Sequence, residues 1–318
     1  MKFSFIIPVF NRPDEVDELL QSLEEQNVKD FEVILIEDGS SDKCDEVVEK
    51  HSDKLDIHYF LKENGGPGPA RNYGAERASG EYLLILDSDC VLPAGYLQAI
   101  ESELTSSPTD AFGGPDRAHE SFTDLQKAIN YSMTSFFTTG GIRGGKKKLD
   151  KFYPRSFNMG VHKDLYEKLG GFSQMRFGED IDFSIRIFES GAKCRLFPEA
   201  WVWHKRRTDF KKFFRQVHNS GIARINLEKR HPGTLKFVHL LPAAFTLSCI
   251  TIVIPIFYSF VIFCDSTIKN RNAHIGILSV PAAFIQLTGY GTGFIKAWWR
   301  RCVLGKPEFE AYKKNFYK

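Results

Sequence analysis

The sequence predicts an α/β fold: a Rossmann-like, mostly parallel sheet flanked by helices, with a C-terminal helical region that associates with a membrane. Three observations support this prediction. Short apolar runs alternate with segments of helical periodicity through the first hundred residues, which is the pattern of βαβ units. Acidic residues follow two of these runs directly. Two stretches beyond residue 236 are long, apolar and free of charged side chains.

The apolar runs of the first hundred residues are predicted strands, and the segments between them are predicted helices. Four runs rich in Ile, Leu, Val and Phe are FSFIIPVF, FEVILIED, DIHYFL and EYLLILDSD. The first, second and fourth are almost continuously apolar, which is typical of strands covered on both faces. After Pro13, apolar residues recur at helical spacing at Val16, Leu19, Leu20 and Leu23. Further helices are predicted from Gly68 to Gly80 and from Pro93 to Leu104.

The middle of the chain is predicted to be less regular. A helix is predicted from Asp124 to Phe137, and the Gly- and Lys-rich segment TGGIRGGKKKLD that follows is expected to be a mobile loop. A helix through EDIDFSIRIFESG and a strand-like segment, KCRLFPEAWVW, then lead to His204. These elements complete a predicted globular domain of residues 1–207.

The C-terminal third is predicted to meet a membrane. Residues 208–236 contain DFKKFFRQVHNSGIARINLEKR, which predicts a basic amphipathic helix at the membrane surface. Within residues 237–318, the runs Phe237–Cys264 and Ile275–Ile295 each reach the length of about 20 residues that crosses a bilayer. We expect two transmembrane helices and a basic tail on the cytoplasmic side, where lysine and arginine are retained. The alternative, favoured by three prolines inside these runs, is that both are buried core helices.

The composition is that of a globular protein, with 318 residues of which 42% are hydrophobic and 26% charged. A formal net charge of +2 does not argue for nucleic acid as a partner. The six cysteines form no Cys-x-x-Cys pair and no zinc-like spacing with histidine, so we expect reduced thiols in a cytoplasmic domain. The first apolar run is short and lacks a small-residue cleavage pattern, and we therefore expect no signal peptide.

Asp87 and Asp89 provide the sharpest chemical signal. They lie at the carboxyl end of the fourth predicted strand, where open α/β sheets bind ligands. Alternate residues at a strand end point the same way, so both carboxylates can face one Mg²⁺ or Mn²⁺ ion bridging a diphosphate. The alternative is a solvated turn, where such pairs are common.

Two further segments point to a nucleotide. In LIEDGSSD, Glu37 and Asp38 end the second predicted strand, and a carboxylate there can accept from a base imide or ribose hydroxyls. In ENGGPGPARNYG, a glycine-rich turn and Arg71 stand at a helix start, where backbone donors and a guanidinium suit a diphosphate. A helix cap and a tight turn are the respective alternatives.

Six motifs occur in a recognisable order: IIPVFNRP, LIEDGSSD, GPARNYG, LILDSDC, FNMGVHKDLYEKLGGF and GEDIDFSIRI. Over about residues 3–205 the chain therefore resembles family 2 glycosyltransferases of the GT-A fold. The resemblance implies a nucleotide-sugar donor and inversion at the anomeric carbon by a single displacement. With the acidic strand ends, it predicts a metal-dependent enzyme.

By position in these motifs, the resemblance implies roles for eight residues, and it implies a ninth role for His204, which follows WVW at a predicted strand end. Around the nucleotide-sugar it places Pro8, Phe10, Asp38, Arg71 and Asp87. For the metal it implies Asp89, Asp87 and His204. Asp180 becomes the candidate catalytic base, with Glu179 beside it at a helix N-terminus, where a carboxylate can take the acceptor's proton. The alternatives are capping of the helix dipole for this acidic pair and a structural role for His204.

The resemblance also bears on the reaction type. Processive synthases of the family carry a Gln-x-x-Arg-Trp signature, whereas the corresponding region here reads RQVHNSGIARINL, without tryptophan. We therefore expect non-processive hexosyl or N-acetylhexosaminyl transfer, with a UDP-sugar donor and a saccharide or lipid-linked saccharide acceptor, in cell-surface polysaccharide or glycolipid synthesis. One alternative is a catalytically silent membrane protein that binds nucleotide-sugars. The other, a sugar nucleotidyltransferase, lacks its expected phosphate loop, because NRPDEV follows the first strand.

Overall fold

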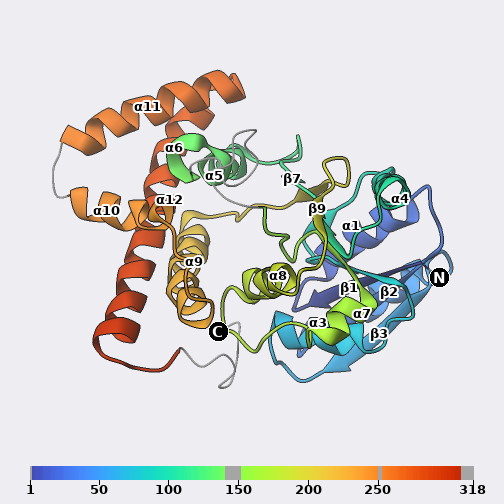
Figure 1. Cartoon of the computed structure of the whole chain (residues 1–318). Helices are drawn as coiled ribbons and strands as arrows, with labels where there is room; N and C mark the ends of the chain where they lie inside the picture. Colours follow the sequence, from blue (N-terminus) through green and yellow to red (C-terminus); the bar gives the residue numbers. More distant parts are fainter. Residues whose placement is uncertain (1, 140–151, 250–252, 309–318) are drawn as a thin grey trace. The chain divides into compact units, whose positions relative to one another are not determined.

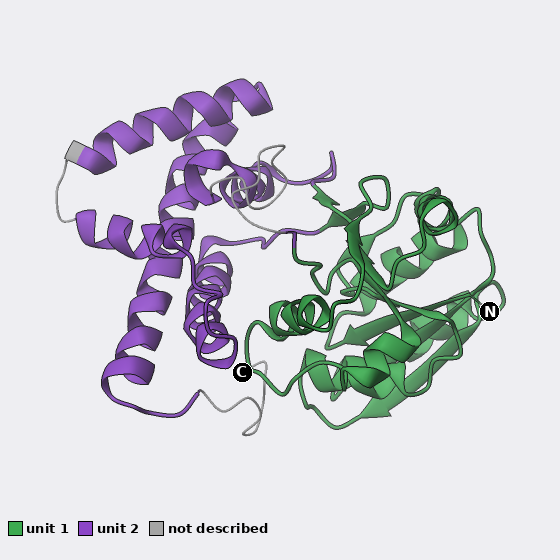
Figure 2. Ribbon diagram, viewed as in Figure 1, with its two compact units in different colours: residues 1–117, 153–204, 310–318 green, residues 118–152, 205–309 purple. Residues whose placement is uncertain are grey.

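A computed structural model gives the structure of the chain. It describes residues 2–139, 152–249 and 253–308. The chain divides into two compact units, coloured separately in Figure 2: unit 1 contains residues 1–117, 153–204 and 310–318, and unit 2 contains residues 118–152 and 205–309. Unit 2 thus includes a segment from the middle of the predicted globular domain. Most of the predicted mobile loop and the end of the predicted basic tail lie outside the described residues.

Unit 1 is built on a seven-stranded sheet in the order β3-β2-β1-β4-β8-β6-β9. The strands are β1 (Phe3–Val9), β2 (Phe31–Asp38), β3 (Ile57–Lys62), β4 (Tyr82–Ile85), β6 (Ala111–Gly113), β8 (Met159–His162) and β9 (Cys194–Leu196). β3, β2, β1 and β4 are parallel, and β8 is antiparallel to both of its neighbours. Every residue of β1 and β2 is buried, which confirms the prediction of strands covered on both faces.

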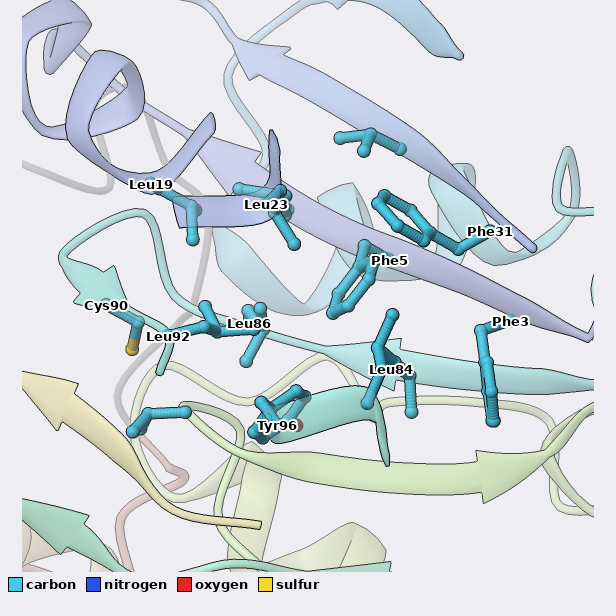
Figure 3. Close-up of a cluster of buried hydrophobic side chains, with 14 of the residues drawn as sticks. Phe3, Phe5, Leu19, Leu23, Phe31, Leu84, Leu86, Cys90, Leu92 and Tyr96 are labelled. Carbon is cyan, nitrogen blue, oxygen red and sulfur yellow. The ribbon is translucent and has the colours of Figure 1, made fainter. Parts of the chain in front are cut away.

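Helices cover the two faces of this sheet. They are α1 (Pro13–Glu24), α2 (Asp45–His51), α3 (Pro67–Ala75), α4 (Tyr96–Ser106), α7 (Lys163–Lys168) and α8 (Glu179–Glu189). On one face, Phe5 of β1 packs in a cluster with Leu19 and Tyr96 of the covering helices (Figure 3). On the other face, Ile6 packs in a second cluster with Ala70 and Phe183. Neighbouring residues of one strand thus pack into the clusters on opposite faces of the sheet, because successive side chains of a strand point to opposite faces.

A small second sheet brings distant segments together. It has the order β5-β10-β7, with β5 (Cys90–Val91), β10 (Val202–His204) and β7 (Asp116–Arg117). His204 is paired with Cys90 across β10 and β5. The predicted strand-like segment before His204 is therefore two strands in two sheets, β9 and β10. Pro198 lies between them and lacks the N–H that a continuing ladder would need.

Unit 2 is helical. Its helices are α5 (Asp124–Thr134), α6 (Phe136–Thr139), α9 (Phe210–Arg230), α10 (Leu241–Ser248), α11 (Val253–Asn270) and α12 (Ala273–Trp298), with a 3₁₀ turn at Phe237–His239 and a π turn at Trp299–Val303. α5, α9, α10 and α11 all pack against α12 (Figure 1). The predicted helix from Asp124 ends at Thr134, because Ser135 is extended. The predicted basic helix is α9.

The two predicted transmembrane runs differ in the structure. The first is divided between the 3₁₀ turn, α10 and α11, with residues 250–252 outside the described part of the chain. The second lies within Ala273–Val303, which is the one helix among the described residues long and apolar enough to cross a membrane by length and composition. Of the apolar 18-residue stretch within this helix, 44% is buried inside the protein. A helix of this kind is also found in the cores of soluble proteins.

Candidate active site

The candidate site lies at one edge of the main sheet of unit 1. Because β1, β2 and β4 are parallel, their carboxyl ends meet at this edge. β2 ends at Asp38, and β4 ends two residues before Asp87. Asn11 ties the loop after β1 to the loop after β2, since its Oδ1 accepts from the backbone N–H groups of Ser41 and Asp42 at 2.8 and 2.9 Å.

Asp89 and His204 form the candidate metal site. Asp89 Oδ1 lies 3.2 Å from His204 Nε2, and the ring of Phe157 stacks on the imidazole. One ligand atom each of Asp89, Cys90 and His204 lies within 4.8 Å of the others. Burial raises the pKa of the Cys90 thiol well above its usual value, and its Sγ donates to the Phe157 carbonyl oxygen at 3.4 Å. The carboxylate of Asp89 and the imidazole of His204 are a donor set that fits a divalent cation.

Arg12 is a site residue that the sequence analysis missed. Its guanidinium donates to Asp89 Oδ2 at 3.0 Å and to Glu15 Oε2 at 2.7 Å. Arg12 directly precedes α1, so its backbone is fixed by the start of that helix. The signal in the sequence was a basic residue immediately before a proline-initiated helix, which is too common a pattern to predict a site. Its effect is to add positive charge beside the candidate metal ligands.

Arg71 links the end of β4 to the start of α8. It donates to Asp87 Oδ1 at 2.7 Å and to Glu179 Oε1 at 3.0 Å, and its guanidinium lies over the Phe172 ring. The Arg71 side chain is buried between these two carboxylates. Asp87 pairs with Arg71 and does not belong to the group formed by Asp89, Cys90 and His204; its predicted share in the metal site stays a prediction.

Asp180 is held by a second arginine absent from the sequence analysis. Arg155 donates from Nε to Asp180 Oδ2 at 2.6 Å, and the Ile181 N–H donates to Oδ1 at 2.9 Å. Burial raises the pKa of Asp180, but Arg155, the charge of Arg71 and the Ile181 N–H together outweigh it, and the pKa lies below its ordinary value. Asp180 is therefore ionised.

The pKa of Glu179 moves the opposite way. Burial and the neighbouring negative charge of Asp180 raise it above the ordinary value, against the lowering effect of Arg71. Two adjacent carboxyl groups whose pKa values are pushed apart are typical of acid–base sites. The third acidic residue of this turn, Asp182, accepts from Ser173 and Arg186 at 2.6 and 3.0 Å and so serves the local structure.

The remaining predicted nucleotide-binding residues lie at the strand ends. Asp38 is fully buried and accepts from Lys62 Nζ at 2.6 Å and from the N–H groups of Gly65 and Gly66 at 2.8 and 2.7 Å. It thereby fixes the glycine turn that opens α3. Pro8 is buried within β1, and Phe10 is half-buried just beyond it. The contribution of these three residues to nucleotide binding stays a prediction.

Three features define a glycosyltransferase fold of the GT-A class: the sheet order, the antiparallel strand β8 within a mostly parallel sheet, and the carboxylates beyond the strand ends. Residues 4–170 match the family described as glycosyl transferase family 2, and the chain belongs to this family. The predicted GT-A fold and the predicted family are therefore confirmed, and the membrane association of the C-terminal region stays a prediction.

Two characterised relatives match parts of the chain. Poly(ribitol-phosphate) beta-N-acetylglucosaminyltransferase TarS of Staphylococcus aureus is 41% identical over 93 residues, which are 28% of this chain and 16% of the relative. GalNAc(5)-diNAcBac-PP-undecaprenol beta-1,3-glucosyltransferase of Campylobacter jejuni is 36% identical over 115 residues, 35% of this chain and 37% of the relative. The matched regions span well under half of either relative.

Solved structures resemble the chain over most of its length. TarS residues 1–349 in complex with UDP-GlcNAc align with a TM-score of 0.52 at 19% identity, covering 96% of this chain and 93% of that one. The mannosyltransferase PcManGT from Pyrobaculum calidifontis, in complex with GDP-Man and Mn2+, aligns with a TM-score of 0.62 at 17% identity, covering 94% and 87%. At such identities the likeness shows the fold alone.

Proposed function

We propose that this chain transfers one sugar from a nucleotide-sugar to an acceptor hydroxyl with inversion, in the synthesis of a cell-surface polysaccharide or glycolipid. The observation that carries the proposal is that unit 1 contains both an Asp89–His204 cluster and an ionised carboxylate, Asp180, at the start of α8. The first suits a diphosphate leaving group. The second suits a general base.

On the donor side, Asp89 and His204 would hold Mg²⁺ or Mn²⁺, and the cation supplies charge compensation for the leaving diphosphate. Arg12 lies against Asp89 and adds a guanidinium, which can donate to phosphate oxygens. Arg71 fixes Asp87 and Glu179 relative to each other, so that the loop after β4 and the start of α8 keep one geometry.

On the acceptor side, Asp180 takes the proton. The acceptor oxygen forms its bond to the anomeric carbon while the bond from that carbon to the diphosphate oxygen breaks, and its electron pair leaves with the diphosphate. The hydroxyl proton passes to Asp180. A carboxylate with a lowered pKa is a weak base, so this transfer comes late, after bond formation has made the hydroxyl acidic. Attack opposite the leaving group inverts the anomeric centre.

Several comparisons support a UDP-sugar donor and a polymer or polyprenol-linked acceptor. A structural relative binds UDP-GlcNAc, one sequence relative acts on poly(ribitol-phosphate), and another acts on an undecaprenol-linked saccharide. We propose in addition that unit 2 attaches the enzyme to a membrane, with unit 1 on the cytoplasmic side. The predominance of basic residues in unit 2 supports this orientation, because the cytoplasmic leaflet carries a negative surface potential.

The test is turnover of a panel of UDP- and GDP-sugars by the full chain with Mn²⁺ or Mg²⁺, with nucleoside diphosphate release as the readout. We expect slow, metal-dependent hydrolysis of one donor, accelerated by a saccharide or lipid-linked acceptor. Binding without any release would favour a silent nucleotide-sugar-binding protein. Formation of a nucleotide-sugar from nucleoside triphosphate and sugar phosphate would favour a nucleotidyltransferase.

A further inference from the structure

We propose that α10 and α11 form a docking surface that lies in the plane of an anionic phospholipid bilayer, and that α12 supports this surface and does not cross the membrane. This inference rests on the proposed membrane attachment and defines its geometry. We call the surface the apolar platform. Its exposed residues are Leu241 and Leu247 of α10 and Ile254, Ile256, Phe257, Phe260 and Ile268 of α11.

The apolar platform exposes an unusual amount of aromatic and aliphatic surface. Ile256, Phe257 and Phe260 are 65%, 70% and 65% exposed. Phe257, Phe260 and Ile268 share one side of α11 by helical spacing, whereas Ile262 and Ser266 on the other side are fully buried. Contiguous exposed apolar surface of this kind marks an interaction site.

The packing around α12 argues against a membrane-spanning helix. Near its start, His274 Nδ1 lies 2.7 Å from an oxygen of Asp124 on α5. Farther along, α9 lies so close that a Cβ on Gly293 would meet the carbonyl oxygen of His218 at 2.0 Å. α5 and α9 are polar helices, and α9 carries Lys211 and Lys212 in its first turn. A bilayer around α12 would have to enclose these charges, which is costly in hydrocarbon.

α12 also separates the apolar helices from the basic one. A Cβ on Gly289 would meet Val217 of α9 at 2.5 Å, whereas a Cβ on Gly291 would meet the Pro242 carbonyl oxygen of α10 at 2.4 Å. Two residues along a helix correspond to a rotation of about 200°, so α9 and α10 lie on opposite sides of α12. The apolar helix α10 and the basic helix α9 thus lie on different sides of α12, as expected of a unit that binds a bilayer with one face.

Charge favours an anionic lipid as the occupant. Residues 205–309 contain sixteen lysines and arginines against four aspartates and glutamates. At the ends of the apolar platform stand Lys236, just before the 3₁₀ turn that leads to α10, and Arg271, just after α11, whereas Lys269 is paired with Asp265 at 2.8 Å. No acidic side chain lies between Phe237 and Cys264. Basic residues flanking an apolar surface lie at headgroup level and attract anionic lipids.

The first test asks which side of the membrane each end of α12 reaches. Three cysteines report it in sealed vesicles that expose the cytoplasmic face, treated with a membrane-impermeant maleimide: Ser107→Cys in unit 1 as the reference, Ala273→Cys at the α11–α12 turn, and the native Cys302. Each is examined alone, in a chain whose other native cysteines are replaced by alanine. We expect equal labelling at all three positions. Labelling of Ala273→Cys or of Cys302 only after detergent would overturn the proposal.

The second test asks what the apolar platform binds. The full chain is floated with vesicles of phosphatidylcholine alone or with phosphatidylglycerol added. Phe257→Ser with Phe260→Ser should weaken vesicle binding by about tenfold or more, because two apolar anchors are lost. The matched control is Leu61→Ser on β3, a side chain 51% exposed in unit 1, which should bind as wild type.

A different outcome would assign the apolar platform to a second copy of the chain. In that case wild type would be a dimer by light scattering, the double variant a monomer, and neither would float with vesicles. This result overturns the lipid proposal. Because no step of either test depends on sugar transfer, failure here leaves the proposed catalytic function unaffected, and the reverse also holds.

Discussion

Arg155 donates to Asp180 at 2.6 Å, and this ion pair joins the segment before β8 to the first turn of α8. The arginine keeps the carboxylate ionised in a buried setting, where a carboxyl group alone would tend to stay protonated. It also occupies one of the two oxygens. The proposed base is thus prepared by a residue that the six sequence motifs do not single out.

Asp180→Asn should separate binding from chemistry. The amide keeps the size of the side chain but cannot accept a proton, so transfer should fall by about 10²- to 10⁴-fold, the usual contribution of a general base. Affinity for nucleoside diphosphate with Mn²⁺, measured by calorimetry, should stay close to wild type. Asp182→Asn is the matched control, since Asp182 serves the local structure through Ser173 and Arg186. Equal loss of transfer in both variants would reduce Asp180 to a structural residue.

Arg155→Gln should change the pH dependence of the reaction. Arg155 lowers the pKa of Asp180, so its removal raises that pKa, and the acid limb of the kcat/KM profile should move to higher pH. The same pairing stabilises the fold above the unfolded-state pKa of aspartate, about 4, and this contribution disappears as pH falls through the lower folded-state pKa. Arg155→Lys, which keeps the charge, should shift the limb less. If the acid limb of the kcat/KM profile were unchanged in Arg155→Gln, a group other than Asp180 would be responsible for that limb.

His204→Ala should weaken metal-dependent donor binding while leaving binding without metal unchanged. The imidazole lies 3.2 Å from Asp89 Oδ1 and is the second proposed ligand of the metal. Cys90→Ser is the control, since the substitution is small and the residue is not assigned to the metal. Calorimetry with nucleoside diphosphate, with and without Mn²⁺, measures the difference. Loss of the metal effect in Cys90→Ser and its retention in His204→Ala would reverse the assignment.

Gly160→Ala should destabilise unit 1. A Cβ at Gly160 of β8 would meet the Phe112 ring at 2.0 Å, and that ring is itself stacked on Phe197 with centroids 4.3 Å apart. Overpacking of this kind costs about 1–3 kcal/mol. Gly95→Ala is the control, because no atom lies within 4 Å of an added Cβ there. Thermal unfolding should show a lower Tm for the first variant only. Equal melting temperatures would show that β8 and β6 move apart without cost.

The parallel half of the sheet was predictable because strands covered on both faces need continuous apolar runs, and β1 and β2 have them. β6 and β8 were not, since each has only three or four residues and is defined by its long-range pairing. The same reason applies to KCRLFPEAWVW, where the break between β9 and β10 follows from pairing with two different sheets.

The candidate site was partly predictable. The carboxylates after β4 and at the start of α8 could be predicted from the local sequence, because they directly follow an apolar strand or open an amphipathic helix. The contact of His204 with Asp89 instead depends on a ladder between β10 and β5, which are far apart in sequence. Arg12 and Arg155 were missed because the role of an arginine is set by where its long side chain reaches. Only the fold determines that reach.

The central claim is that Asp89 belongs to a metal site that serves a nucleotide-sugar. The most direct measurement is Mn²⁺-dependent release of nucleoside diphosphate from the preferred donor by wild type and by Asp89→Ala, with folding of both checked by thermal unfolding. We predict metal-dependent release by wild type and none above background by the variant, because one carboxylate of the site is lost. Equal release by the two proteins, or release by wild type that ignores the metal, would contradict the account.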